Sequence, residues 1–268
     1  MSMMINTNLV SLNAQRNTST SQNALSTAMQ RLSSGLRVNS AKDDAAGLAI
    51  GERMNAQVRG MNVAIRNAND GISLSQTADG ALATVSDALQ RMRELAVQAA
   101  SGSNGAGDLA NLNTEYQELK GEVARIGAQT KFNGIAILAG GAGAKVFQVG
   151  ANAGETLTVT TVAVGAVVGD LTSNANATTA LGTLDTQLDA INTDRATYGA
   201  AMNRFSFAIS NLQTASENQA AARSRIMDAD FASETANLSR AQILQQAGNA
   251  MVAQANQLPQ QVMTLLRG

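Results

Sequence analysis

Apolar residues recur at alternating spacings of three and four along much of the chain. The clearest row runs from 181 to 212, where every position but one is apolar. Its members are Leu181, Leu184, Leu188, Ile191, Arg195, Tyr198, Met202, Phe205, Ile209 and Leu212. A heptad row of this length predicts a long helix that packs against other helices.

The first half of the chain carries matching rows, which shift phase near 75–79. The first row is Met54, Val58, Met61, Ile65, Ala68 and Ile72, and the second is Leu82, Val85, Leu89, Met92 and Ala96. They predict one helix over about 44–99, which would be about 84 Å long at about 1.5 Å per residue. A helix of that length needs partners along its apolar row.

A shorter helix is predicted after the Gly- and Ser-rich stretch 101–107. Asp108 is placed to cap it, because a carboxylate at a helix start accepts free backbone N–H groups. Its apolar row is Leu112, Tyr116, Leu119, Val123 and Ile126. We expect this helix to fold back on the long one, so that three helices form a rod.

The two ends of the chain carry thinner apolar stripes. The N-terminal stripe is Leu25, Met29, Leu32 and Leu36, and the C-terminal stripe is Leu244, Met251, Leu258, Val262 and Leu265. Neither stripe is wide enough to form a core alone. The pattern leaves two interpretations open: a frayed coiled-coil end, or a segment that folds only when many copies assemble.

Between the helical zones, residues 132–178 are rich in Gly, Ala, Thr and Val. Large apolar residues alternate with Thr at 157–160 and with Ala at 162–164, which predicts two half-buried strands. About 45 residues suffice for a hairpin or a small sheet, but not for a large domain. The run from Gly140 to Val146 superficially resembles a phosphate-binding loop. It lacks the Gly before Lys145 and the hydroxyl after it, so we interpret it as a turn.

The amino-acid composition excludes several kinds of binding and catalytic chemistry. The formal charge of -1 offers no electrostatic footprint for nucleic acid or an anionic membrane. There is no Cys and no His, which removes the thiol nucleophile, the commonest general base and the commonest zinc ligand. The N-terminus has no basic and apolar pattern typical of a cleaved secretory signal. We therefore expect no catalytic residue, no metal and no cofactor, and we expect the protein not to be an enzyme.

Longer motifs at both ends resemble the bacterial flagellins. They are the N-terminal run 31–50 (RLSSGLRVNSAKDDAAGLAI), the C-terminal run 222–231 (ARSRIMDADF), and the later segments 241–248 and 258–262. The segments 131–134 and 147–152 resemble the hairpin segments of the same family. The resemblance covers nearly the whole chain outside about 155–178.

The resemblance implies a mainly α fold: an elongated antiparallel helical bundle or coiled coil with a small β-hairpin region, in which the N- and C-terminal helices pair. It divides the chain into four segments. These are 1–42 (N-terminal channel-lining helix and linker), 43–178 (rod helices and hairpin region), 179–222 (C-terminal rod helix) and 223–268 (C-terminal linker and channel-lining helix).

The resemblance also implies a function. The chain would be a secreted structural subunit that polymerises into the extracellular flagellar filament used for motility, through the two terminal stripes. Implied partners are an export chaperone at the C-terminal helix, hook-filament junction and cap proteins, and a host Toll-like receptor. By the family motif, the receptor would contact Arg91, Leu95 and Glu115. Leu265 and Leu266 resemble the segment that cytosolic flagellin sensors bind.

One residue departs from the family pattern. Phe207 lies off the heptad row, where the family usually has a small polar residue, and we expect it to contact a neighbouring subunit or the hairpin. Two other interpretations of the chain stay open: a hook-filament junction protein, and a coiled-coil scaffold that does not polymerise.

Overall fold

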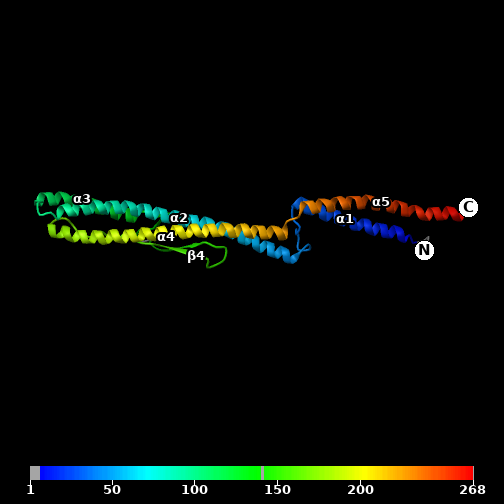
Figure 1. Cartoon of the computed structure of the whole chain (residues 1–268), viewed down its shortest axis with the longest axis horizontal. Coiled ribbons are helices and arrows are strands. Elements are labelled where there is room, and N and C mark those ends of the chain that lie inside the picture. The colour runs from blue at the N-terminus through cyan, green and yellow to red at the C-terminus, as the bar shows by residue number, and fades with distance from the viewer. Residues whose placement is uncertain (1–6, 140–141, 268) are drawn as a thin grey trace. The chain divides into compact units, whose positions relative to one another are not determined.

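The fold is mainly helical, with two small antiparallel hairpins (Figure 1). The computed structural model describes residues 7–139 and 142–267, with side chains described as far as Gln257. The helices are α1 (Leu9–Ser34), α2 (Ala45–Ala99), α3 (Ala106–Gln129), α4 (Asn174–Met227) and α5 (Phe231–Arg267). The strands are β1 (Lys131–Phe132), β2 (Ile135–Ala136), β3 (Gly143–Gln148) and β4 (Thr156–Thr161). The predicted fold class is confirmed.

The chain divides into two compact units. The terminal unit comprises Met1–Ala56 and Asn218–Gly268, and the central unit comprises Gln57–Glu217. These divisions fall inside α2 and inside α4. Of the boundaries that the sequence predicted, 42/43 lies in the link between α1 and α2, and 222/223 lies inside α4. The four-segment division stays a prediction.

In the central unit, α3 and α4 both run antiparallel to α2 and contact it. Arg93 on α2 pairs with Asp185 on α4 at 2.6 Å, and Asp79 pairs with Arg195 at 2.8 Å. On the other partner helix, Glu115 of α3 lies 2.9 Å from Arg91. Because α2 has two partner helices, it buries a wider arc than one heptad row.

The core of the central unit is built from the predicted heptad rows. Leu184, Ile191, Tyr198 and Phe205 of α4 are buried, and so are Leu82, Val85, Leu89, Met92 and Ala96 of α2. The remaining apolar members of the α4 row are half-buried. The helix prediction for 44–99 agrees with α2 to within one residue at its start.

Gly71 of α2 forms a notch for an aromatic ring of α4. A Cβ added at Gly71 would lie 2.5 Å from Cζ of Phe205. The Phe205 ring also meets Phe147 of β3 edge-on, with ring centroids 5.5 Å apart and planes at 86°. The absence of a side chain at residue 71 therefore lets α2 and α4 approach closely where the hairpin packs on them.

The β3–β4 hairpin differs from the predicted strands. β4 contains the predicted 157–160, but 162–164 is not a strand and β3 occupies part of the Gly-rich run that we interpreted as a turn. The strand prediction for 162–164 is wrong because its backbone bonds elsewhere. Val162 N–H donates to the Tyr198 hydroxyl at 3.4 Å, and Val164 N–H donates to the carbonyl of Leu138 at 3.0 Å.

Two acidic residues stabilise helix starts. Asp44 directly precedes α2 and accepts from Gly47 N–H at 2.7 Å, so its carboxylate complements the positive end of the long helix. Asp108 is not the cap residue that the sequence predicted, because α3 begins earlier, at Ala106. Asp108 lies in the first turn and accepts from Gly105 N–H at 3.1 Å instead.

Candidate assembly surface and receptor residues

The terminal unit pairs α1 with α5 along a narrow seam (Figure 1). Among the side chains that the structure describes, the buried apolar residues of these two helices are all alanines: Ala28, Ala241 and Ala255. Polar contacts connect the helices as well. The Asn8 side chain donates to the carbonyl of Ala255 at 2.7 Å, and the Ser11 hydroxyl donates to Asn256 at 2.8 Å. Small residues let the helices lie close together, but they bury little apolar area.

Large apolar side chains of the same two helices are left exposed instead. Apart from Phe231 at the very start of α5, those at least half exposed among the described side chains are Leu9, Val10, Leu12 and Met29 on α1, and Ile243, Leu244 and Met251 on α5. Fully burying one such side chain is worth about 1.5–3 kcal/mol. These seven residues are named the terminal apolar set.

The predicted terminal stripes divide between the seam and this set. Leu25, Leu32 and Leu36 are half-buried, whereas Met29, Leu244 and Met251 are exposed. Leu258, Val262 and Leu265 lie outside the residues whose side chains are described, and so does Leu266. Leu9, Val10, Leu12 and Ile243 belong to none of the predicted apolar stripes. The signal that marks them in the sequence is that each is an apolar position outside any such row.

The link after α1 is held against the link before α5. Gly35 adopts φ 71°, and Leu36 and Asp228 form an antiparallel bridge. Ala229 N–H donates to the carbonyl of Gly35 at 2.9 Å, and the Arg37 guanidinium donates to the carbonyl of Ile226 at 2.7 Å. The two motifs that carried the family resemblance are thus joined to each other by backbone hydrogen bonds.

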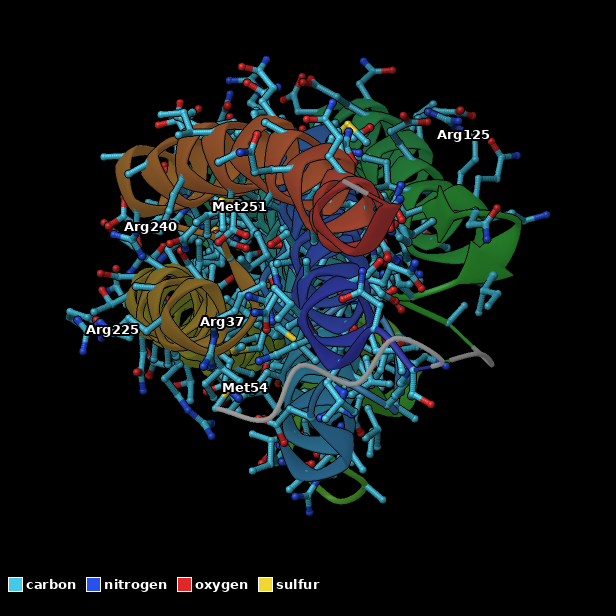
Figure 2. The ribbon with its side chains drawn as sticks, turned by 90° about the vertical axis from the view of Figure 1, so that its right-hand side faces the viewer. Arg37, Met54, Arg125, Arg225, Arg240 and Met251 are labelled. Atoms are coloured by element: carbon cyan, nitrogen blue, oxygen red, sulfur yellow. The ribbon has the colours of Figure 1, made fainter. Side chains whose placement is uncertain are left out.

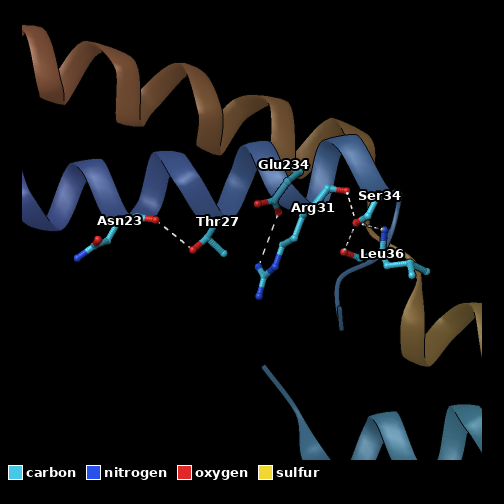
Figure 3. A network of polar contacts seen from close by, with 6 residues as sticks. All are labelled: Asn23, Thr27, Arg31, Ser34, Leu36 and Glu234. Carbon is cyan, nitrogen blue, oxygen red and sulfur yellow. Dashed lines mark hydrogen bonds and ion pairs between the residues drawn. The ribbon is translucent and has the colours of Figure 1, made fainter. Parts of the chain in front are cut away.

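Arg31 lies at the end of α1 beside this corner (Figure 3). Its guanidinium is 3.9 Å from the carboxylate of Glu234, whose side chain is only 11% exposed. Nε of Arg31 is buried and has no hydrogen-bond partner among the described residues. This pair is therefore a loose electrostatic contact rather than a hydrogen-bonded salt bridge. Other charged side chains, such as Arg125 and Arg225, extend outward from their helices (Figure 2).

Two of the three predicted receptor residues meet on the surface of the central unit. The Arg91 guanidinium lies 2.9 Å from Glu115 and 3.0 Å from Glu94. Hydrogen bonds to Glu94 and then to Glu115 raise the pKa of Arg91 above its ordinary value. Leu95 is 1% exposed, so its side chain is not accessible in the isolated chain. The receptor assignment of these residues stays a prediction.

The described residues contain no group of three or more potential Asp or Glu metal ligands. Nor does the described part of the chain hold a helix long and apolar enough to cross a membrane. What it does hold is a three-helix unit with a continuous core and a terminal helix pair with exposed apolar side chains. These features are typical of helical structural proteins.

Comparisons with known proteins identify the family. Residues 5–142 match the bacterial flagellin N-terminal helical region, and residues 181–266 match the bacterial flagellin C-terminal helical region. A flagellin of Halalkalibacterium halodurans is 49% identical over 272 residues, covering 99% of this chain and 100% of that protein. The flagellar filament 33 kDa core protein of Treponema phagedenis is 40% identical over 286 residues, covering 99% and 100%. The crystal structure of Bacillus cereus flagellin matches with a TM-score of 0.52 at 36% identity, covering 59% of this chain and 94% of that one.

The chain belongs to the bacterial flagellins, and it is a structural subunit of the flagellar filament. The resemblance found in the end motifs is thereby confirmed. Nothing in these matches favours a hook-filament junction protein or a non-polymerising scaffold.

Proposed function

We propose that the terminal apolar set drives polymerisation of this chain into the filament. The observation that carries the proposal is the exposure of Leu9 at 63%, Ile243 at 66% and Met251 at 58% on helices whose own seam is alanine. Burying them against neighbouring copies would supply the association free energy. The interface is heterologous, because a filament grows without closing on itself.

The test is seeded elongation of the purified chain, followed by electron microscopy and sedimentation. Ile243→Gln with Met251→Gln removes two exposed apolar groups, neither of which lines the groove between α1 and α5. We expect the critical concentration to rise at least tenfold, while the monomer keeps its helical circular dichroism. Gln246→Ser, an exposed polar change on the same helix, is the matched control. Unchanged elongation of the double variant would refute the proposal.

A deletion tests the same function more broadly. Removing 233–268 takes away all of α5 except its first two residues, and with it every α5 member of the terminal apolar set. We expect a soluble chain that forms no filaments, since the terminal unit has then lost one of its two partner helices. Filaments from the truncated chain would show that assembly does not need the terminal unit.

We also propose that α5 is the binding site of an export chaperone before assembly, and that the filament lies outside the cell. The apolar residues Ile243, Leu244 and Met251 support this, because an unassembled chain exposes them to water. A chaperone that covers α5 should protect its amides from hydrogen exchange and leave those of α3 unchanged. If the α5 amides exchange in the complex as fast as they do in the free chain, the proposal is contradicted. Further proposed partners are the hook-filament junction and cap proteins.

A host Toll-like receptor is a further proposed partner, through Arg91 and Glu115. Their side chains are 52% and 47% exposed, so a partner can reach both. Leu95 would then act by packing beneath them. Arg91→Ala and Glu115→Ala should each lower receptor signalling in a reporter cell by tenfold or more. Arg125→Ala, another exposed arginine of the central unit, should signal like the unchanged chain, and equal signalling by all three variants would contradict the assignment.

A further inference from the structure

A groove of about 440 Å³ lies on the central unit between α4 and the turn that joins β3 to β4. Val149, Leu157 and Ala208 contribute apolar walls, and Phe207 lies beside them with 77% of its surface exposed. Two residues along a helix are about 200° apart around its axis. Because the buried Phe205 packs into the notch at Gly71, Phe207 is directed to the opposite side of α4, into solvent.

Arg204 lines the same groove and has no charged partner within the described residues. The nearest candidate by position, Glu155, is already engaged in the hairpin turn. Its carboxylate accepts from the backbone N–H of Asn152 at 3.0 Å and from the Asn152 side chain at 2.9 Å. These bonds, the side-chain bond first, lower the pKa of Glu155 below its ordinary value. An exposed aromatic ring beside an unpaired arginine is the composition typical of an interface anchor.

An acidic surface lies elsewhere on the same unit, on α2 and α3. Asp87 and Glu118 are exposed, and their carboxylates make no hydrogen bond or ion pair with any described residue. Asp87 lies one turn before Arg91, and Glu118 lies about one turn after Glu115. Since α2 and α3 are antiparallel and the Arg91–Glu115 pair joins them, Asp87 and Glu118 lie at the same level along the unit. Glu94 and Glu115 add two further carboxylates there, against the single charge of Arg91.

The groove and the acidic surface lie at different levels along α2. Phe205 marks the level of the groove, because it faces Gly71. Asp87 is sixteen residues further along the helix, a displacement of about 24 Å at about 1.5 Å per residue. The two surfaces belong to different elements. The groove holds Arg204, which has no ion-pair partner among the described residues, together with Glu155, whereas the acidic surface carries four carboxylates against the single charge of Arg91. In a filament whose copies all point the same way, the groove of one copy can therefore meet the acidic surface of the next. Such a contact joins two unlike surfaces, as a heterologous interface requires.

We propose that the groove at Phe207 and Arg204 receives the acidic surface at Asp87 and Glu118 of a second copy, displaced by about 24 Å along the helix axis. Arg204 pairs with the carboxylates, and Phe207 is covered by the helices that carry them. The inference rests on the filament assembly described above and specifies which surfaces of the central unit meet. It also gives Phe207 the neighbouring-subunit contact that its place off the heptad row led us to expect.

The experiment measures the critical concentration of full-length chains elongating from wild-type seeds, at low and at high salt. The variants are Phe207→Ser, Arg204→Glu, the double change Asp87→Lys with Glu118→Lys, and the triple change that combines the last two. Asp189→Lys is the matched control, since it reverses an exposed acid on α4 outside both surfaces. Circular dichroism of each monomer shows that the fold is retained.

We expect Phe207→Ser, Arg204→Glu and the double variant each to raise the critical concentration about tenfold. The critical concentration of the triple variant should return most of the way to the wild-type value. Added salt should make both the increase in the charge-changed variants and this return smaller. Asp189→Lys should stay within twofold of wild type. Wild-type elongation with no effect of Phe207→Ser or Arg204→Glu would overturn this interface and leave filament assembly intact. Failure of the wild-type chain to elongate would overturn assembly itself, and this interface with it.

Discussion

Replacing Gly71 by alanine tests how tightly α4 packs into α2. The new Cβ would lie 2.5 Å from Cζ, 2.8 Å from Cε2 and 2.9 Å from Cε1 of Phe205. All three distances are shorter than ordinary carbon contacts of about 3.5–4.0 Å. The Phe205 ring is 1% exposed and also packs edge-on against Phe147, so it has little room to move away.

The expected magnitude is the difference of two opposing effects. Alanine in a helix interior is favoured over glycine by about 1 kcal/mol. Overpacking a filled core costs about 1–3 kcal/mol. The free energy of unfolding of Gly71→Ala should therefore lie between the wild-type value and about 2 kcal/mol below it. Gly80→Ala is the matched control on the same helix, because an added Cβ there meets nothing within 4 Å and should gain about 1 kcal/mol.

Thermal unfolding followed by tyrosine fluorescence measures this difference directly. The chain has two tyrosines and no tryptophan, and both Tyr116 and Tyr198 are buried in the central unit, so the signal reports that unit alone. A packing cost of about 1–3 kcal/mol should lower the Tm of Gly71→Ala by about 3–9 °C relative to Gly80→Ala. Equal Tm values for the two variants would refute the claim that residue 71 must lack a side chain.

Three further substitutions follow from the central unit. Burial raises the pKa of Asp194, so its charged form is disfavoured in the folded chain; Asp194→Asn should raise the Tm at pH 7. That gain should vanish as the pH falls below the ordinary carboxyl range, and a gain that persists in acid would contradict the burial argument. Phe205→Ala should cost about 3–5 kcal/mol by urea unfolding, because it empties the notch; a loss below about 1 kcal/mol would mean that the site collapses freely. Arg91→Ala should change stability by at most about 1 kcal/mol, since its ion pairs are exposed, and a larger change in Tm would show that the pairs are structural.

The long helices could be predicted because their evidence is local. Spacings of three and four put the same face of α4 inward from 181 to 212, and the buried residues Leu184, Ile191 and Tyr198 follow the prediction. Arg195 interrupts that row, and the reason could not be seen in the row itself. Its partner Asp79 lies on another helix, within the stretch 75–79 where the α2 row changes phase. The ion pair occupies the edge of the seam, with side chains 39% and 33% exposed.

The hairpin and the site residues depend on contacts that are distant in sequence. The alternation at 162–164 looks like a strand locally, but strand pairing needs a partner in register, and β4 takes β3 over six residue pairs that end at Thr161. Similarly, Leu95 falls beside the apolar row of α2, and the family motif assigns it to a receptor contact. It is buried because α2 has a second partner helix, which widens the apolar arc beyond one heptad row.

The notch at Gly71 also determines how α2 and α4 align lengthwise. Heptad rows repeat every seven residues, so by apolar pattern alone α4 could slide one heptad along α2 and still bury the same kind of surface. Such a slip would move the Phe205 ring from Gly71 to Ala64 or Ala78, both of which are buried and carry a Cβ where the ring must lie. The glycine therefore selects one register of α4 on α2 among several that the heptad pattern alone would allow. Among related chains, we expect an aromatic residue at the position of Phe205 to occur together with glycine at the position of Gly71.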